Sequence, residues 1–236
     1  MVDYAKSVEL APPGWRHFTV QDIDRLPPAV REHELGRVPQ MERDLLALGD
    51  AEAVIRVERF FFWTFVYHLD PERWDELAQV EPIHPEILAA LPAGASRALD
   101  IGAGSGRLTR HLVTRSSRVT AVEPSAGLRR LMRERLPSVI TMAGWAEALP
   151  LGDACSDLTA ACGALGPDPV VLDELRRVTA PGGVIALVSP ECPEWFEAHG
   201  WRRITATPVR APLHPRWIDD FFGPPHPPHE LVMIWI

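Results

Sequence analysis

The sequence has few cysteines and no long apolar run. Its three cysteines, Cys155, Cys162 and Cys192, are spaced like neither a paired disulfide framework nor a C-x-x-C zinc motif. The most apolar stretch, residues 60–66, is far shorter than the roughly 20 residues that a membrane-spanning helix needs. The first 15 residues lack the apolar core and the cleavage pattern of a secretion signal. We therefore expect a cytoplasmic protein without a membrane span.

Basic residues are in the minority. The 236 residues include 24 Lys and Arg against 32 Asp and Glu, which gives a formal net charge of -8. A negative chain repels the phosphate backbone of nucleic acids and the surface of an anionic membrane. This balance argues against a nucleic-acid or membrane partner and favours a small ligand.

From residue 96 onward, short apolar runs alternate with helix-like stretches, a pattern typical of a parallel sheet covered by helices. The expected strands are 97–101, 118–123, 139–143, 157–162 and 183–189, and the expected helices are 107–114, 126–136 and 170–178. Two further strands, 201–209 and 230–236, have no helix of useful length between them. Because parallel pairing needs a long crossover, we expect these two to pair antiparallel at one sheet edge.

The first 95 residues follow a different pattern. They are rich in proline to about residue 39, which predicts an extended leader, and the expected helices are 41–48, 51–69 and 85–91. Asp50 stands where a helix N-cap belongs, and Val57, Phe61 and Phe65 recur at helical spacing behind it. We therefore divide the chain into a leader with a helical cap, residues 1–95, and a sheet domain, residues 96–236. The aromatic helix face either packs on the sheet domain or serves a pocket or a dimer contact.

A glycine-rich turn connects the first expected strand to the helix after it. Glycines at 102, 104 and 106 form a G-x-G-x-G pattern, whereas the dinucleotide fingerprint G-x-G-x-x-G needs a glycine where Arg107 stands. A pyrophosphate cradle is therefore disfavoured. Such a turn brings bare backbone and a helix N-terminus against a ligand, although close packing between helix and strand also requires glycine.

The second expected strand ends in a carboxylate. Glu123 follows Gly102 by 21 residues, about where an acid reaches the ribose hydroxyls of a nucleotide in a wound sheet. The alternative is a solvated acid at a strand end. Together, the glycine turn and this acid predict a nucleoside-binding site.

Residues 74–236 resemble the class I, Rossmann-like, S-adenosylmethionine-dependent methyltransferases. The resemblance rests on four segments in the family's order: the acid-x-Gly-x-Gly-x-Gly motif at 100–106, the acid at 123, the segment 144–150, and the segment 175–183 before strand five. It implies an α/β fold with a doubly wound, seven-stranded, mostly parallel sheet whose last strand is antiparallel, here preceded by the N-terminal helical cap.

The resemblance also implies where S-adenosylmethionine binds. The 100–106 motif would hold the methionine part, Glu123 the ribose, and Leu128, Ala146 and Glu147 the adenine. The expected cofactor-binding residues are Asp100, Gly102, Ala103, Gly104, Gly106, Glu123, Pro124, Leu128, Ala146, Glu147, Ala161 and Cys162.

The chain departs from the family after the fourth expected strand. Small-molecule members often carry an aromatic or histidine cluster there, but residues 161–167 read Ala-Cys-Gly-Ala-Leu-Gly-Pro. The Asn/Asp-Pro-Pro-aromatic motif of amino-methylating nucleic-acid enzymes is missing there, and no carboxylate cluster suggests a catalytic magnesium ion. We therefore expect metal-independent, in-line methyl transfer to a small-molecule acceptor, driven mainly by positioning and water exclusion.

Residues for the acceptor are harder to name, and no catalytic residue is assigned. Trp74, His84 and Trp195 are candidates for the substrate pocket, and His68, His84 and Glu191 are candidate bases should the acceptor need one. The alternatives are packing for the tryptophans and capping of the next helix for His84. Two other functions stay open: an S-adenosylmethionine-binding protein without catalysis, and a nicotinamide-dependent oxidoreductase.

Overall fold

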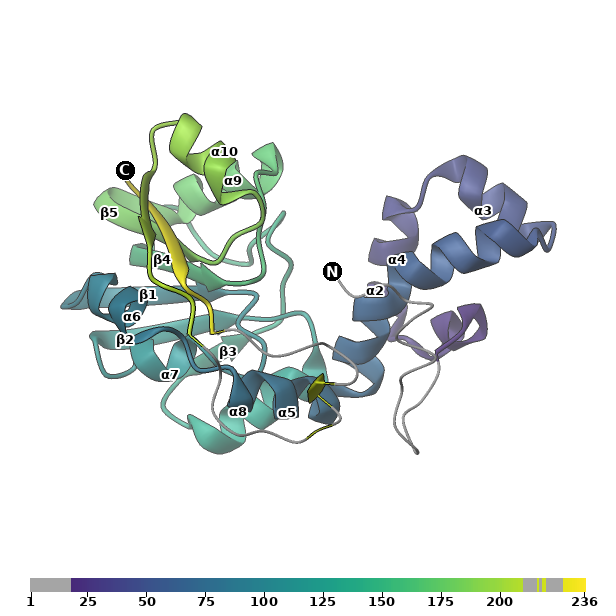
Figure 1. Ribbon diagram of the computed structural model, residues 1–236, viewed down its shortest axis with the longest axis horizontal. Coiled ribbons are helices and arrows are strands. Elements are labelled where there is room, and N and C mark those ends of the chain that lie inside the picture. Colours follow the sequence, from purple (N-terminus) through teal and green to yellow (C-terminus); the bar gives the residue numbers. More distant parts are fainter. Residues whose placement is uncertain (1–17, 210–215, 217, 220–226) are drawn as a thin grey trace. The chain divides into compact units, whose positions relative to one another are not determined.

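The computed structural model describes residues 18–209, 216, 218–219 and 227–236 (Figure 1). The chain forms two compact units. The first comprises Met1–Trp74 with His214–Pro224, and the second comprises Asp75–Leu213 with Pro225–Ile236. The proposed division into a cap, residues 1–95, and a sheet domain, residues 96–236, stays a prediction.

The described part of the first unit is helical. It contains the 3-10 helix η1 (Val20–Arg25) and the helices α2 (Pro28–Arg37), α3 (Gln40–Ala47) and α4 (Ala51–Leu69). The predicted extended leader is therefore wrong over residues 18–39, while residues 1–17 lie outside the described part. The prolines stand at helix starts: Pro27 is the N-cap of α2, Pro28 is its first residue, and Pro39 is the N-cap of α3. Proline is tolerated there because the first amides of a helix have no partner within the helix.

Helix α4 has the predicted bounds. The Asp50 carboxylate accepts a hydrogen bond of 2.8 Å from the amide of Ala53, which confirms the N-cap. Phe61 and Phe65 are fully buried, and the ring of Phe65 lies 5.4 Å from that of Phe18. The aromatic face thus forms part of the core of the first unit.

The second unit contains a seven-stranded sheet in the order β3-β2-β1-β4-β5-β7-β6. Its strands are β1 (Ala95–Ile101), β2 (Ser116–Val122), β3 (Ile140–Met142), β4 (Ser156–Cys162), β5 (Thr179–Val188), β6 (Arg202–Thr205) and β7 (Glu230–Trp235). Strands β1 to β5 pair in parallel, and β7 pairs antiparallel with both β5 and β6. The predicted α/β class and the antiparallel pair at the sheet edge are confirmed.

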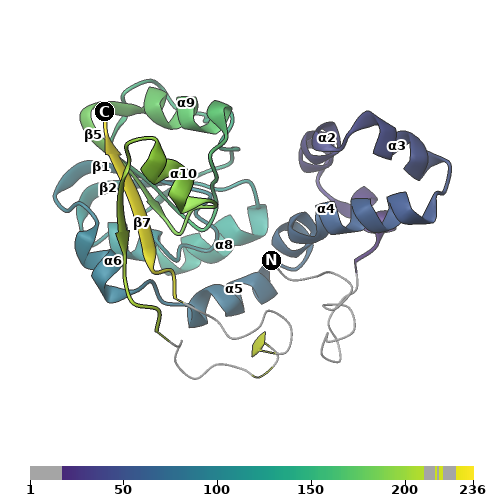
Figure 2. The ribbon, with the colours of Figure 1, turned by 45° about the horizontal axis from the view of Figure 1, so that its top comes forward.

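Helices cover both faces of this sheet (Figures 1 and 2). One hydrophobic core joins the sheet to α6 (Pro85–Ala90), α7 (Thr109–Leu112) and α8 (Ala126–Arg135). The other core joins it to α9 (Pro169–Val178) and α10 (Pro193–Ala198). The central strands β1, β4 and β5 are therefore mostly buried, which explains their largely apolar sequences, whereas the edge strand β3 has no buried residue.

Several elements differ from the sequence-based expectation. Helix α7 is shorter than predicted, and α10 and α5 (Pro71–Val80) were not predicted. Strand β5 begins directly after α9 and passes through Pro181, where the pairing register with β4 shifts between Ser156 and Leu158. Helix α6, assigned above to the cap, belongs to the compact unit of the sheet.

Candidate functional site

The candidate site lies at the carboxyl ends of three neighbouring strands. Strand β1 lies between β2 and β4, and its last residue, Ile101, pairs with Val122 on one side and Ala161 on the other. The glycine loop follows β1, Glu123 follows β2, and Cys162 is the last residue of β4. Ligands of wound α/β sheets bind at this edge.

The glycine loop has a backbone that favours glycine. Gly102, Gly104 and Gly106 have φ angles of 63°, 57° and 100°. A Cβ atom on Gly102 would lie 2.8 Å from that of Ala164, and one on Gly106 would lie 3.1 Å from Cδ1 of Leu136. Close packing therefore explains the glycines at 102 and 106.

Asp100, at the end of β1, is completely buried. Its Oδ2 atom accepts a hydrogen bond of 2.6 Å from the hydroxyl of Thr109, and its Oδ1 atom has no hydrogen-bond partner. Burial raises the pKa of this carboxyl to about 7, an effect that the hydroxyl of Thr109 partly offsets and the nearby Glu123 increases. An unsatisfied buried acceptor is costly, so Oδ1 is suited to a donor that a ligand brings.

Glu123 joins the glycine loop to helix α8. Its Oε2 atom accepts a hydrogen bond of 2.9 Å from the amide of Gly104, and its Oε1 atom accepts one of 2.8 Å from the amide of Ser125. Burial raises the pKa of Glu123, while the two amides act in the opposite direction. Because each carboxylate oxygen has two lone pairs, both oxygens can still accept from ligand hydroxyls.

The other predicted cofactor residues lie around this edge. Pro124 is half-buried after β2, whereas Leu128 is fully buried on α8 and leaves little surface for an adenine. Ala146 and Glu147 are half-buried in the turn that follows β3. Their assignment to adenine stays a prediction.

Two predicted cofactor residues end strand β4. Ala161 is buried in the core on the α9 side. Cys162 is half-buried, and its thiol pKa is raised by burial. Ala103, in the glycine loop, is buried and donates its amide to the carbonyl of Val122 at 3.2 Å.

The three candidate pocket residues belong to different elements of the two units. Trp74 belongs to the first unit, where its ring lies 4.9 Å from that of Tyr67. His84 is the N-cap of α6, and its Nδ1 atom accepts from the amide of Glu86, as the capping alternative predicts. Trp195, on α10, stacks on His199 at 3.8 Å.

The candidate bases also belong to different elements. His68 lies in α4 of the first unit, and Glu191 is an exposed residue after β5 in the second. His84 uses its Nδ1 atom as a helix cap. The substrate pocket and the base therefore stay predictions.

Sequence reasoning missed residues that support the site. Thr109 holds Asp100, and Ser125 both caps α8 and donates to Glu123. The serine before an amphipathic helix is a capping signal that could have been found. The mostly buried side chains of Arg107 and Glu81 form an ion pair of 2.7 Å. This pair could not have been found from the sequence, because nothing in the local sequence relates residues so far apart.

Two features are absent from the part of the chain that the structure describes. No group of three or more His, Cys, Asp or Glu side chains among them could hold a metal ion. None of the helices they form is long and apolar enough to cross a membrane.

The segment that contains the glycine loop is similar to known proteins. Residues 98–183 match a family described as a methyltransferase domain. An uncharacterized methyltransferase of Mycobacterium tuberculosis is 41% identical over 100 residues, which are 42% of this chain and 41% of that protein. A malonyl-[acyl-carrier protein] O-methyltransferase of Pectobacterium atrosepticum is 30% identical over 167 residues, which are 67% of this chain and 65% of that protein.

A solved structure shares the fold. A putative S-adenosylmethionine-dependent methyltransferase from Methanococcus maripaludis superposes with a TM-score of 0.51 at 16% identity, covering 70% of this chain and 91% of that one. The alignment with the mycobacterial protein covers less than half of that protein's length. The matched region begins within β1 and includes strands β2 to β4, helix α9 and the loops that follow β1, β2 and β4.

Proposed function

We propose that this chain, whose residues 98–183 match a methyltransferase domain family, transfers the methyl group of S-adenosylmethionine directly to a small organic acceptor without a metal ion. The cofactor supplies an electrophilic methyl group on its sulfonium. The protein must bind the cofactor, orient it and keep water out.

The orphaned Oδ1 atom of Asp100 carries this proposal. It is a fully buried acceptor without a partner at the end of β1. The methionine part of the cofactor carries an ammonium group, which is a charged donor that matches this atom. The ribose carries two hydroxyls, which match the free lone pairs on Glu123 at the end of β2.

The chemical class of the methyl acceptor is inferred from the segment at the end of β4. Residues 161–167 contain one titratable side chain, Cys162, and its raised pKa makes it a poor base at neutral pH. This arrangement suits an acceptor whose nucleophilic atom is already deprotonated at neutral pH, such as a carboxylate. The name of the Pectobacterium relative describes an O-methyltransferase that acts on malonyl-[acyl-carrier protein].

Calorimetric titration with S-adenosylmethionine and with NAD tests the cofactor. We expect binding of the first alone, and binding of NAD alone would refute the proposal in favour of an oxidoreductase. Formation of S-adenosylhomocysteine is then followed with a panel of small organic acids, amines and phenols, each acid offered free and as a carrier-bound thioester. Turnover of a free molecule supports the proposal. Turnover of the carrier-bound thioester alone would refute the small-molecule acceptor and indicate a carrier-bound acceptor instead. Binding without turnover would favour a non-catalytic binding protein.

A further inference from the structure

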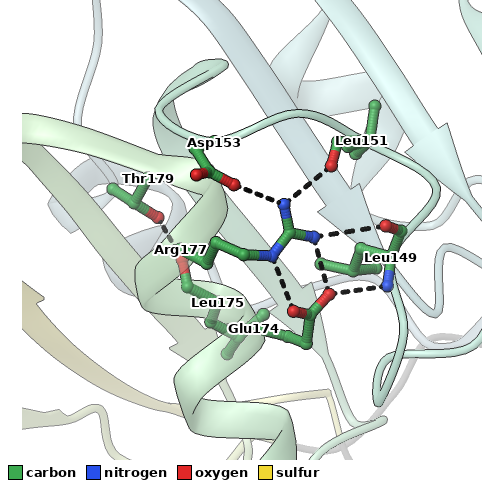
Figure 3. Close-up of polar contacts among 7 residues, drawn as sticks. All are labelled: Leu149, Leu151, Asp153, Glu174, Leu175, Arg177 and Thr179. Atoms are coloured by element: carbon green, nitrogen blue, oxygen red, sulfur yellow. Dashed lines mark hydrogen bonds and ion pairs between the residues drawn. The ribbon is translucent and has the colours of Figure 1, made fainter.

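Helix α9 carries Arg177, whose guanidinium binds the segment before strand β4 (Figure 3). Its Nη1 atom donates to the carbonyl of Leu151 at 2.8 Å and to Oδ1 of Asp153 at 2.9 Å. Its Nη2 atom donates to the carbonyl of Leu149 at 3.2 Å. One side chain therefore holds three residues of the segment 149–153.

Glu174, one turn earlier on α9, completes the arrangement. Its carboxylate accepts hydrogen bonds from Nε and Nη2 of Arg177 at 2.6 and 2.7 Å, so the ion pair is bidentate. Its Oε2 atom also accepts from the amide of Leu149 at 2.8 Å. Arg177 holds the pKa of Glu174 below its usual range, so the pair is ionised at neutral pH. The amide and the carbonyl of Leu149 are thus both bound by this pair.

The segment that the pair holds has a constrained backbone. The amide of Leu151 donates to the carbonyl of Leu149, only two residues earlier, at 2.8 Å. Ala154 has a φ angle of 49°, in the left-handed region that favours glycine, and its amide donates to the carbonyl of Arg177. Such conformations are strained and persist where surrounding contacts impose them.

The segment in turn contacts the edge that binds the cofactor. A Cβ atom on Gly144 would lie 2.7 Å from Cδ of Pro150 and 2.9 Å from Cγ1 of Val122, so Pro150 packs against the backbone at Gly144 beside the end of β2. The carbonyl of Val122 accepts from the amides of Gly102 and Ala103. Ala146 and Glu147, the predicted adenine contacts, lie between Gly144 and Pro150 in the chain.

We propose that Arg177 and Glu174 are positioning residues that fix the 144–150 segment and thereby shape the adenine side of the cofactor site. This inference rests on the proposed function, because it assumes that S-adenosylmethionine binds at this edge. Neither residue touches the reacting atoms. They act through Leu149 and Pro150, from a helix that otherwise packs on the sheet.

The test compares Arg177→Met with Arg176→Met. Arg176 is the neighbour on the same helix, and its exposed guanidinium pairs only with Asp173 at 3.2 Å among the contacts of the described residues. Dissociation constants are measured for S-adenosylmethionine and for adenosine, well below the melting temperature of each variant. For Arg177→Met we expect both constants to rise about tenfold and by the same factor. For Arg176→Met we expect both to stay within about twofold.

Hydrogen exchange provides a second readout that a general loss of stability would not reproduce. The amides of Leu149 and Ala154 should exchange faster in Arg177→Met, while the amides of β1 keep the protection of the wild type. If Arg177→Met does not fold, Glu174→Gln replaces it. That variant keeps an acceptor for Leu149 but loses the ionic pair, and we expect a smaller loss in the same direction.

The outcomes separate the two proposals. If the wild type binds neither ligand, the proposed function fails and the positioning role fails with it. If the wild type binds both and Arg177→Met binds them equally well, only the positioning role is overturned. A loss for S-adenosylmethionine without a loss for adenosine also overturns it, because the effect would then lie on the methionine side.

Discussion

Replacing Asp100 with Asn should stabilise the protein while weakening cofactor binding. The pKa of Asp100 is about 7 in the folded protein against an ordinary value of 3.8, because the carboxyl is completely buried. At about 1.4 kcal/mol per pH unit, the ionised form costs the fold up to about 4 kcal/mol at pH 8. Asn carries no charge and can still accept from Thr109, so Asp100→Asn avoids this cost. Its amide nitrogen then occupies the place of the unpartnered oxygen, and that buried donor offsets about 1–3 kcal/mol of the gain.

The pH dependence follows from the direction of the shift. Because the folded pKa is raised, the folded protein binds more protons than the unfolded chain between about pH 4 and pH 7. The contribution of Asp100 to the stability of the wild type therefore falls as pH rises through this window, and Asp100→Asn should lack that fall. The two proteins should differ little at pH 4 and most at pH 8.

The same substitution removes the anion that we assign to the ammonium of S-adenosylmethionine. A hydrogen bond to a charged group contributes about 1.5–3 kcal/mol, so the dissociation constant should rise about tenfold to a hundredfold at pH 8. Wild-type affinity should fall below pH 7, where Asp100 becomes protonated. The assays are denaturant unfolding and calorimetric titration at several pH values between 4 and 8.

A matched control is Asp157→Asn. The carboxylate of Asp157 pairs with Arg97 at 2.7 Å, and that pairing lowers its pKa. This variant should lose a little stability at pH 8 and keep the affinity of the wild type. The reasoning about Asp100 is refuted if Asp100→Asn destabilises the protein at pH 8, or if it binds the cofactor as tightly as the wild type does.

Three further variants probe the site and the first unit. Glu123→Gln turns one acceptor into a donor that faces the amide of Gly104 or Ser125. It should therefore cost about 1–3 kcal/mol of stability and weaken cofactor binding. Unchanged stability and affinity would show that these hydrogen bonds contribute little. Gly106→Ala forces a side chain into a φ of 100° and should lower stability by about 1–3 kcal/mol in denaturant unfolding, whereas a neutral result would contradict the assigned backbone. Asp50→Ala removes the N-cap of α4 and should cost about 1 kcal/mol of stability without changing cofactor affinity; an altered affinity would connect the first unit to the cofactor site.

Local sequence patterns predicted the strands of the sheet correctly but gave the wrong conformation for the proline-rich leader over residues 18–39. Continuous apolar runs and a glycine turn indicate buried parallel strands whatever the rest of the chain does, and strands were found at all seven predicted places. The prolines at 27, 28 and 39 suggested an extended chain, yet they begin helices. Whether a proline interrupts a helix or starts one depends on its position in that helix.

The sequence by itself determined the order of the strands along the chain, the glycine loop after β1 and the acid at the end of β2, because each depends on residues that are close in sequence. Only the tertiary structure decided that Asp100 keeps one oxygen without a partner, since its burial depends on β2, β4 and Thr109 together. The contact between Arg177 and Leu149 is likewise tertiary, because 28 residues and strand β4 separate the two in sequence. Charge and hydrogen-bond partners across such distances depend on how the elements pack, which residue spacing does not specify.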